Sequence, residues 1–219
     1  KGVKQPVTDV ATIFVSPRFE PFQKEEVRLA VHHAIDKKTI VDKVLLGFGI
    51  PVSTTEAPLY DAHTDFNFPF DADRARQLLA KAGYSRSNPL RLKAMTTKGV
   101  RTKDFEVMTA ITQMWRDVGI EAELEIVTIP QWFQHRNAKT VAPLSFYFWS
   151  NATGDPINSV GFMTRNKGPF KVWESPDVDP KVDPIFTEID ERKRIAAAKE
   201  AARYVVERGY IIPLYQVVM

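Results

Sequence analysis

LRLKAMTTKGVRTKDFEVMTAITQMWRDVGIEAELEIV, residues 90–127, is the stretch that decides the fold class. Residues 90–95 are predicted to form a strand, residues 103–118 a helix that ends at Gly119, and residues 121–127 a second strand of alternating polar and apolar side chains. The inward face of the helix is apolar at helical spacing: Val107, Ile111, Met114, Trp115 and Val118. Two strands joined by a helix through short connections form a right-handed crossover, in which the strands are parallel.

The rest of the chain continues to alternate strands and helices. Further strands are predicted around residues 10–15, 144–149 and 211–218. Further helices are predicted after Pro21 with an apolar stripe from 27 to 35, at 37–46 between Asp36 and Gly47, from Asp71 to Gly83, at 130–137 and at 184–208. The sequence therefore predicts an α/β fold with a mixed sheet, organised as one domain.

One long segment, residues 51–69, has no predicted helix or strand. It is rich in proline and is accompanied by four aromatic side chains: Tyr60, Phe66, Phe68 and Phe70. Long ordered loops in compact domains are often functional. Two interpretations remain open, a loop that covers the surface through aromatic anchors and a lid over a ligand.

Composition excludes several classes of protein. The 219 residues have a net charge of +3 and 44% hydrophobic content, which is typical of a globular protein and short of the basic surface that nucleic-acid binding requires. No apolar run approaches the ~18–20 residues of a membrane-spanning helix. The absence of cysteine excludes disulfides, thiolate nucleophiles and cysteine-based zinc sites, and it is compatible with an oxidising compartment.

The sequence also lacks the motifs that identify common enzymes and cofactor sites. It contains no G-x-G-x-x-G, Walker A, G-x-S-x-G or H-E-x-x-H motif. His32 and His33 are adjacent on a predicted helix and so point about 100° apart, which prevents them from chelating one metal. We therefore predict no catalytic residues, no metal site and no cofactor.

A binding crevice is expected where the parallel strands end, because ligands of open α/β sheets collect beyond the carboxyl ends of those strands. One such end is the loop 96–101, where Lys98 and Arg101 lie just before a helix. Free N–H groups at a helix N-terminus favour anions, and the two cations would add to that preference. The alternative is that both are solvated loop cations.

The second end follows the strand 144–149, which contains four consecutive aromatic residues, 146–149. Aromatic side chains on both faces are typical of a central strand, and core packing accounts for Phe146 and Phe148. Trp149, followed by the polar loop 150–155, is predicted to stand at the mouth of the crevice. The candidate ligand-binding residues are therefore Lys98, Arg101, Trp149, Ser150, Asn151 and Asp155.

Several short motifs occur together in one order along the chain. The first group consists of Pro21-Phe22, residues 27–30 and residues 34–37 (AIDK). Four further motifs follow it, at 70–84, at 115–120, at Trp149 with 154–156, and at 212–215. In this order they resemble the signature of the family 5 extracellular solute-binding proteins, the peptide, nickel and related receptors of bacterial ABC importers.

This resemblance implies the large C-terminal lobe of a two-lobed periplasmic-binding-protein-like fold. We expect residues 1–219 to be an excised piece of a longer receptor, without its N-terminal lobe, and residues 1–15 and 211–219 to lie near the hinge. The resemblance further implies a monomeric, non-enzymatic receptor in the periplasm or otherwise outside the cytoplasm. Such a receptor closes on a small solute or peptide and delivers it to the permease subunits of the transporter.

The chain departs from the family pattern at one position. Peptide-binding members have an Asp three residues after the tryptophan, where it pairs with the peptide ammonium, and this chain has Ala152 there. Asp155 is a possible substitute, and the Lys98–Arg101 loop falls where dipeptide receptors hold the ligand carboxylate. We expect a ligand with an anionic group rather than a free-amine peptide. A sugar, an opine, a metal chelate, a hydrolase that uses Asp155 and an interaction module are the alternatives.

Overall fold

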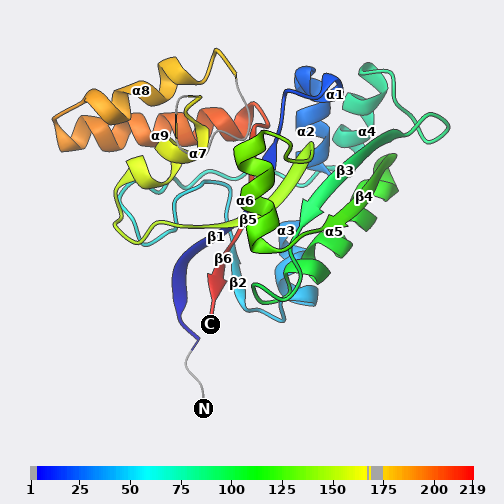
Figure 1. Ribbon diagram of the computed structural model, residues 1–219, viewed down its shortest axis with the longest axis horizontal. Helices are drawn as coiled ribbons and strands as arrows, with labels where there is room; N and C mark the ends of the chain where they lie inside the picture. The colour runs from blue at the N-terminus through cyan, green and yellow to red at the C-terminus, as the bar shows by residue number, and fades with distance from the viewer. Residues whose placement is uncertain (1–3, 167, 169–174) are drawn as a thin grey trace.

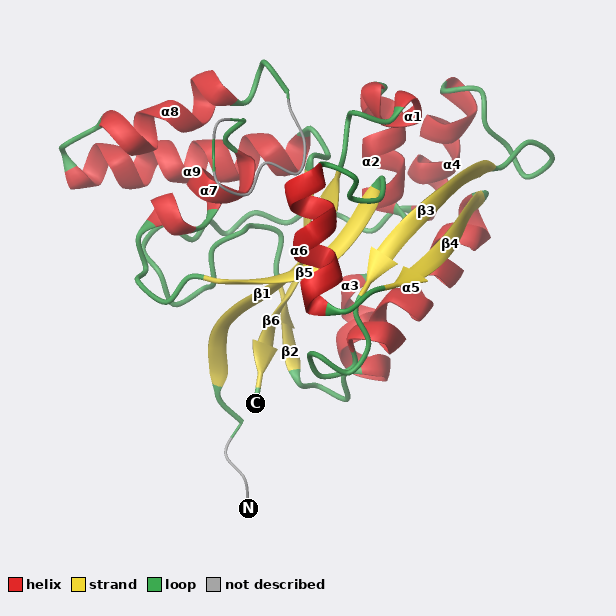
Figure 2. Cartoon of the chain, in the orientation of Figure 1, coloured by secondary structure: helices red, strands yellow, loops and turns green. Residues whose placement is uncertain are grey.

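The computed structural model describes residues 4–166, 168 and 175–219, and the described residues form one mixed six-stranded sheet (Figures 1 and 2). Its strand order is β2-β6-β1-β5-β3-β4. The strands are β1 (Pro6–Val15), β2 (Gly49–Pro51), β3 (Leu90–Thr96), β4 (Ile120–Ile126), β5 (Leu144–Ser150) and β6 (Ile211–Val218). The predicted α/β fold with a mixed sheet is confirmed.

The crossover predicted at residues 90–127 is present. β3 and β4 are parallel from Leu90, opposite Ile120, to Thr96, opposite Ile126, and they are joined by α5 (Asp104–Val118). Trp115 on the inward face of α5 is fully buried, and its indole N–H donates to the Val31 carbonyl oxygen at 2.9 Å. Gly119 ends the helix in the left-handed conformation, as predicted.

β5 is a central strand, antiparallel to β1 and parallel to β3. Its aromatic side chains alternate between the two faces, and Phe146 and Phe148 belong to one hydrophobic cluster. Trp149 belongs to the other cluster, against which Tyr147 packs. The prediction that aromatic residues cover both faces is therefore confirmed.

Helices cover both faces of the sheet (Figure 2). The cluster that contains Phe146 includes residues of α2 (Glu25–His33), α4 (Ala72–Lys81) and α5, near the short helices α1 (Glu20–Gln23) and α3 (Lys37–Thr39). The cluster that contains Trp149 includes residues of α6 (Ile129–Ala138), α7 (Val160–Thr164), α8 (Asp179–Thr187) and α9 (Glu191–Glu207). None of the helices in the described ranges combines the length and apolar character needed to cross a bilayer.

Two predicted helices differ from the observed ones. The helix expected at 37–46 is α3 followed by a π-helical turn, Ile40–Val44, in which the Leu45 amide donates to the Ile40 carbonyl oxygen. The helix expected at 184–208 is wrong, because the chain is extended at Glu188 and Asp190 begins α9 by accepting a hydrogen bond from the Lys193 amide. Pro184 lies inside α8 instead of starting a helix.

Arg28 joins α2 to the connection between α9 and β6. Only 5% of the residue is exposed, and its guanidinium donates to the carbonyl oxygens of Arg208 and Phe22, both at 2.8 Å, and of Gln23 at 3.1 Å. The guanidinium also lies 4.4 Å from the centre of the Tyr210 ring. One buried cation therefore satisfies three backbone carbonyls that come from two distant parts of the chain.

The residues just beyond the paired ends of β1 and β6, Gln5 and Met219, are hydrogen-bonded to each other. The Gln5 amide donates to the Met219 carbonyl oxygen at 2.8 Å, and the Met219 amide donates to the Gln5 carbonyl oxygen at 3.0 Å. Residues 5 and 219 therefore lie at the same end of the sheet, beyond the start of β1 and the end of β6 (Figure 1). Of the segment 1–15 expected near a hinge, residues 1–3 lie outside the described residues.

Candidate functional site

The carboxyl ends of β3 and β5 lie at one edge of the sheet, because the two strands are parallel through Ala94, opposite Leu144, and Met95, opposite Ser145. The loop after β3 contains Lys98 and Arg101, and the loop after β5 contains residues 150–155. The structure thus brings the two predicted halves of the crevice to a common edge.

The loop after β3 is built around Asp104. Its carboxylate accepts hydrogen bonds from the Thr97 hydroxyl and from the amides of Gly99, Val100 and Arg101, at 2.8 to 3.2 Å. Burial acts to raise the pKa of Asp104, but these donors outweigh it and the pKa lies below its ordinary value. The prediction that free backbone N–H groups here bind an anion is therefore wrong, since Asp104 already accepts from them.

Arg101 and Lys98 differ in their surroundings. Arg101 has a half-exposed side chain, and its Nη2 lies 3.5 Å from Oδ2 of Asp9 on β1. The Lys98 ammonium lies 4.8 Å from the centre of the Phe105 ring, a cation–π contact on the first turn of α5. Any preference of this edge for an anion therefore depends on side chains, chiefly on the guanidinium of Arg101.

Hollows flank Arg101 on two sides. One has a volume of about 220 Å³ and is lined by Thr97, Val100, Arg101, Ile129, Tyr147 and Phe148. The other has a volume of about 130 Å³ and extends from Asp9 and Arg101 to Tyr215 and the end of β6. Both combine apolar walls with a few polar groups, and each is smaller than the ~300–1,000 Å³ of a typical ligand pocket, so each has room for only part of a ligand.

Trp149 is 7% exposed, and its indole N–H donates to the Asn158 carbonyl oxygen at 2.6 Å. The prediction that this ring stands open at the mouth of the crevice is wrong, because it packs in the hydrophobic cluster beneath α7 and α9. Ser150 is exposed, and its hydroxyl is 2.9 Å from that of Thr8. Binding of a ligand by either residue stays a prediction.

Asn151 organises the loop after β5 from within. It is 3% exposed, its Oδ1 accepts from the Gly154 amide at 3.0 Å, and its Nδ2 donates to the Asp155 carbonyl oxygen at 3.0 Å. Asp155 forms an ion pair with Arg194 at 3.0 Å and accepts from the Ile157 amide. The carboxylate proposed as a substitute for the missing Asp is therefore already paired, and Ala152 is exposed.

Glu56 is a buried acid of this region that the sequence did not single out. It lies in the segment 51–69, is 0% exposed, and accepts a hydrogen bond from Asn151 Nδ2 at 3.3 Å. Burial raises the pKa of Glu56 to about 7. The Tyr60 hydroxyl donates to the Asn151 carbonyl oxygen, so the segment is anchored onto the loop after β5. This arrangement favours a covering loop over a mobile lid.

Residues 1–170 match the model of the bacterial extracellular solute-binding proteins, family 5. The chain belongs to this family. It also resembles Di/tripeptide-binding protein 1 of Pseudomonas aeruginosa, with 30% identity over 205 residues, which are 89% of this chain and 37% of the relative. The chain thus spans well under half the length of this curated relative.

Solved structures show the same fold. The Escherichia coli murein tripeptide binding protein MppA aligns with a TM-score of 0.85 and 21% identity over 98% of this chain and 43% of its own. NikA from Staphylococcus aureus, solved with Ni(L-His)2, aligns with a TM-score of 0.87 and 15% identity over 99% of this chain and 46% of its own. Within the described ranges, no group of three or more His, Asp or Glu side chains could hold a metal ion.

Proposed function

We propose that this chain is the larger, C-terminal ligand-binding lobe of a solute receptor that serves a bacterial ABC importer. The observation that carries the proposal is the shared edge of β3 and β5, where Arg101 is exposed between two hollows in a chain of the solute-binding family. The receptor would capture its solute outside the cytoplasm, in the periplasm or at the cell surface, and deliver it to the permease. It would do so as a monomer and without catalysis.

The proposal of a second lobe rests on length and on the strand pair at the chain ends. The chain spans 37% of its 30%-identical relative, which leaves room for a lobe on the other side of the crevice. β1 and β6 run side by side to the edge of the sheet, so the two segments 4–15 and 211–219 would form the hinge connection. Closure about such a connection would bury a solute between the lobes.

The solute is proposed to be peptide-like and to have an anionic group. The named ligands of similar proteins are di- and tripeptides and a nickel–histidine complex, and all of these contain carboxylates. Arg101 could bind one as a fork of two N–H donors. A sugar, an opine or a metal chelate is the alternative within the same class. A hydrolase is less well supported, because Asp155 is already bound to Arg194.

The test uses the full-length receptor. Mass spectrometry of solute released from the purified protein identifies the ligand, and titration calorimetry measures its affinity. Arg101→Ala is expected to weaken binding of that solute by at least tenfold, while Arg91→Ala, which removes an exposed ion pair with Glu121, serves as the control and leaves affinity unchanged. Recovery of no solute, together with turnover of a hydrolase substrate, would overturn the proposal.

A further inference from the structure

We propose that Asp9 and Arg101 together recognise a solute with an α-amino-acid head group, in which the ammonium and the carboxylate are attached to the same carbon. This inference rests on the proposed receptor function and concerns the same edge of the sheet. It follows from the position of one acid that the family pattern does not assign.

Asp9 and Arg101 come from distant parts of the chain and meet across the end of β5. Asp9 lies on β1 directly opposite Ser150, the last residue of β5, and Arg101 lies in the loop after β3. Their charged atoms are 3.5 Å apart, with 19% of the Asp9 side chain and 51% of the Arg101 side chain exposed. A pair at this distance with one half-exposed partner is weak, so a ligand can replace the contact between Asp9 and Arg101 at little cost.

The neighbouring carboxylates already have partners. Asp155 is paired with Arg194, Asp104 accepts hydrogen bonds from the loop after β3, and Glu56 is completely buried. The position of the family's ammonium-binding Asp holds Ala152. A ligand ammonium that reaches this edge would otherwise lose its hydration without gaining a countercharge, which is costly. Asp9 is the acid placed to supply that charge.

The spacing of the two charges selects the chemistry of the ligand. The ammonium and carboxylate of an α-amino-acid head are attached to one carbon. The ammonium can therefore face the Asp9 carboxylate while the carboxylate faces the Arg101 guanidinium. The free ends of an ordinary dipeptide lie roughly 6 Å apart, since each extended residue spans ~3.3–3.6 Å. These ends match the pair less well, because Asp9 and Arg101, whose charged atoms are 3.5 Å apart, would have to move further apart to meet both of them.

The hollows leave room around such a head group. The hollow of about 220 Å³ is lined by Thr97 and Tyr147, and the hollow of about 130 Å³ is lined by Asp9 itself. Arg101 lines both of them. A solute held at the pair could therefore extend its remaining atoms along the sheet edge without moving the strands.

Two isomers test this inference on the full-length receptor. γ-Glutamylglycine has its ammonium and one carboxylate on the same carbon, whereas α-glutamylglycine has the same atoms and net charge without that head group. We expect calorimetry to show at least tenfold tighter binding of the γ isomer. Asp9→Asn is expected to weaken binding of the γ isomer by at least tenfold and to remove the preference, and Glu121→Gln, in the exposed pair with Arg91, is the control that changes neither.

The wild-type comparison decides the question even if the Asp9 variant folds poorly. Equal or tighter binding of the α isomer overturns the inference and leaves the receptor function standing. Failure of both isomers to bind also overturns it. Whether the receptor function fails as well is then decided separately, by the presence or absence of a solute released from the purified receptor.

Discussion

Replacing Arg28 with alanine should destabilise the protein strongly, because the guanidinium satisfies three backbone carbonyls where α2 meets the end of α9. Hydrogen bonds to a charged group contribute about 1.5–3 kcal/mol each. The cost of burying the cation offsets part of this stabilisation, and water that enters the space after truncation can satisfy some of the carbonyls. We therefore expect a loss of about 3–5 kcal/mol in the free energy of unfolding, as for other broken buried ion contacts.

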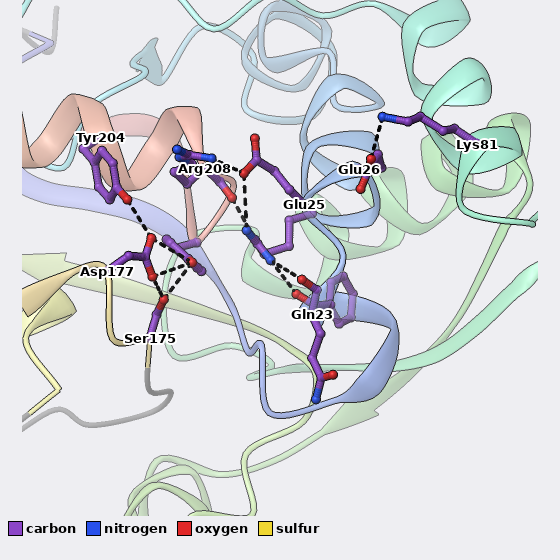
Figure 3. Close-up of polar contacts among 11 residues, drawn as sticks. Gln23, Glu25, Glu26, Lys81, Ser175, Asp177, Tyr204 and Arg208 are labelled. Carbon is purple, nitrogen blue, oxygen red and sulfur yellow. Dashed lines mark hydrogen bonds and ion pairs between the residues drawn. The ribbon is translucent and has the colours of Figure 1, made fainter.

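Urea unfolding followed by far-UV circular dichroism measures this loss, and thermal unfolding gives a second reading. For a chain of this size the melting temperature should fall by roughly 6–20 °C, at ~2–4 °C per kcal/mol. The control is Lys81→Ala, which removes an exposed ion pair with Glu26 on the same helix layer and should change the midpoint little (Figure 3). If Arg28→Ala loses no more stability than Lys81→Ala, the reasoning is refuted.

Three further substitutions can be measured in the same unfolding assay. Asp104→Asn should lower the free energy of unfolding by about 2–3 kcal/mol at neutral pH, because one oxygen acceptor is lost. The pKa of Asp104 is lowered in the folded protein, so this difference in stability between variant and wild type should narrow as pH falls below 3.8, the ordinary pKa of the group. A difference in stability that stays constant with pH contradicts this. Glu56 ionises at 4.5 when unfolded and at about 7 when folded, so its contribution to stability falls as pH rises through that window. Glu56→Gln should remove this loss, about 3 kcal/mol at most, and parallel pH profiles for variant and wild type would refute the assignment. Gly209→Ala should destabilise more than Gly83→Ala: both glycines have positive φ, but a Cβ at Gly209 would lie 2.7 Å from Arg28 Cβ while none at Gly83 meets a neighbour within 4 Å. Equal losses would show that the close approach to Arg28 does not matter.

The β3–α5–β4 crossover was predictable because its signals are local. Apolar spacing defines α5, and Gly119 ends it in the left-handed conformation that glycine adopts without strain. The helix expected at 184–208 failed for an equally local reason. Asp190 is a strong N-cap inside the expected span, and it divides the segment into α8 and α9.

The candidate site was less predictable, because its geometry depends on which side chains accept hydrogen bonds from the backbone amides of its loops. The sequence placed Lys98 and Arg101 before a helix, yet it did not show that Asp104 accepts the neighbouring amides. The contact between Asp9 and Arg101 joins residues 92 positions apart, and it follows from sheet register, which a single sequence does not specify. Trp149 was placed on the correct strand, but its burial depends on how α7 and α9 pack.

The hydrogen-bonded pair of Gln5 and Met219 has a consequence for protein engineering. In a lobe cut to run from Gln5 to Met219, a short glycine–serine linker could join these two residues into a circular chain without stretching either strand. New termini could then be opened in the exposed turn at Ser85–Asn88, which precedes β3 and so lies at the opposite end of that strand from Arg101. Such a permuted lobe would keep every strand pairing of the sheet, and it could be inserted as a compact cassette into a loop of an unrelated host protein.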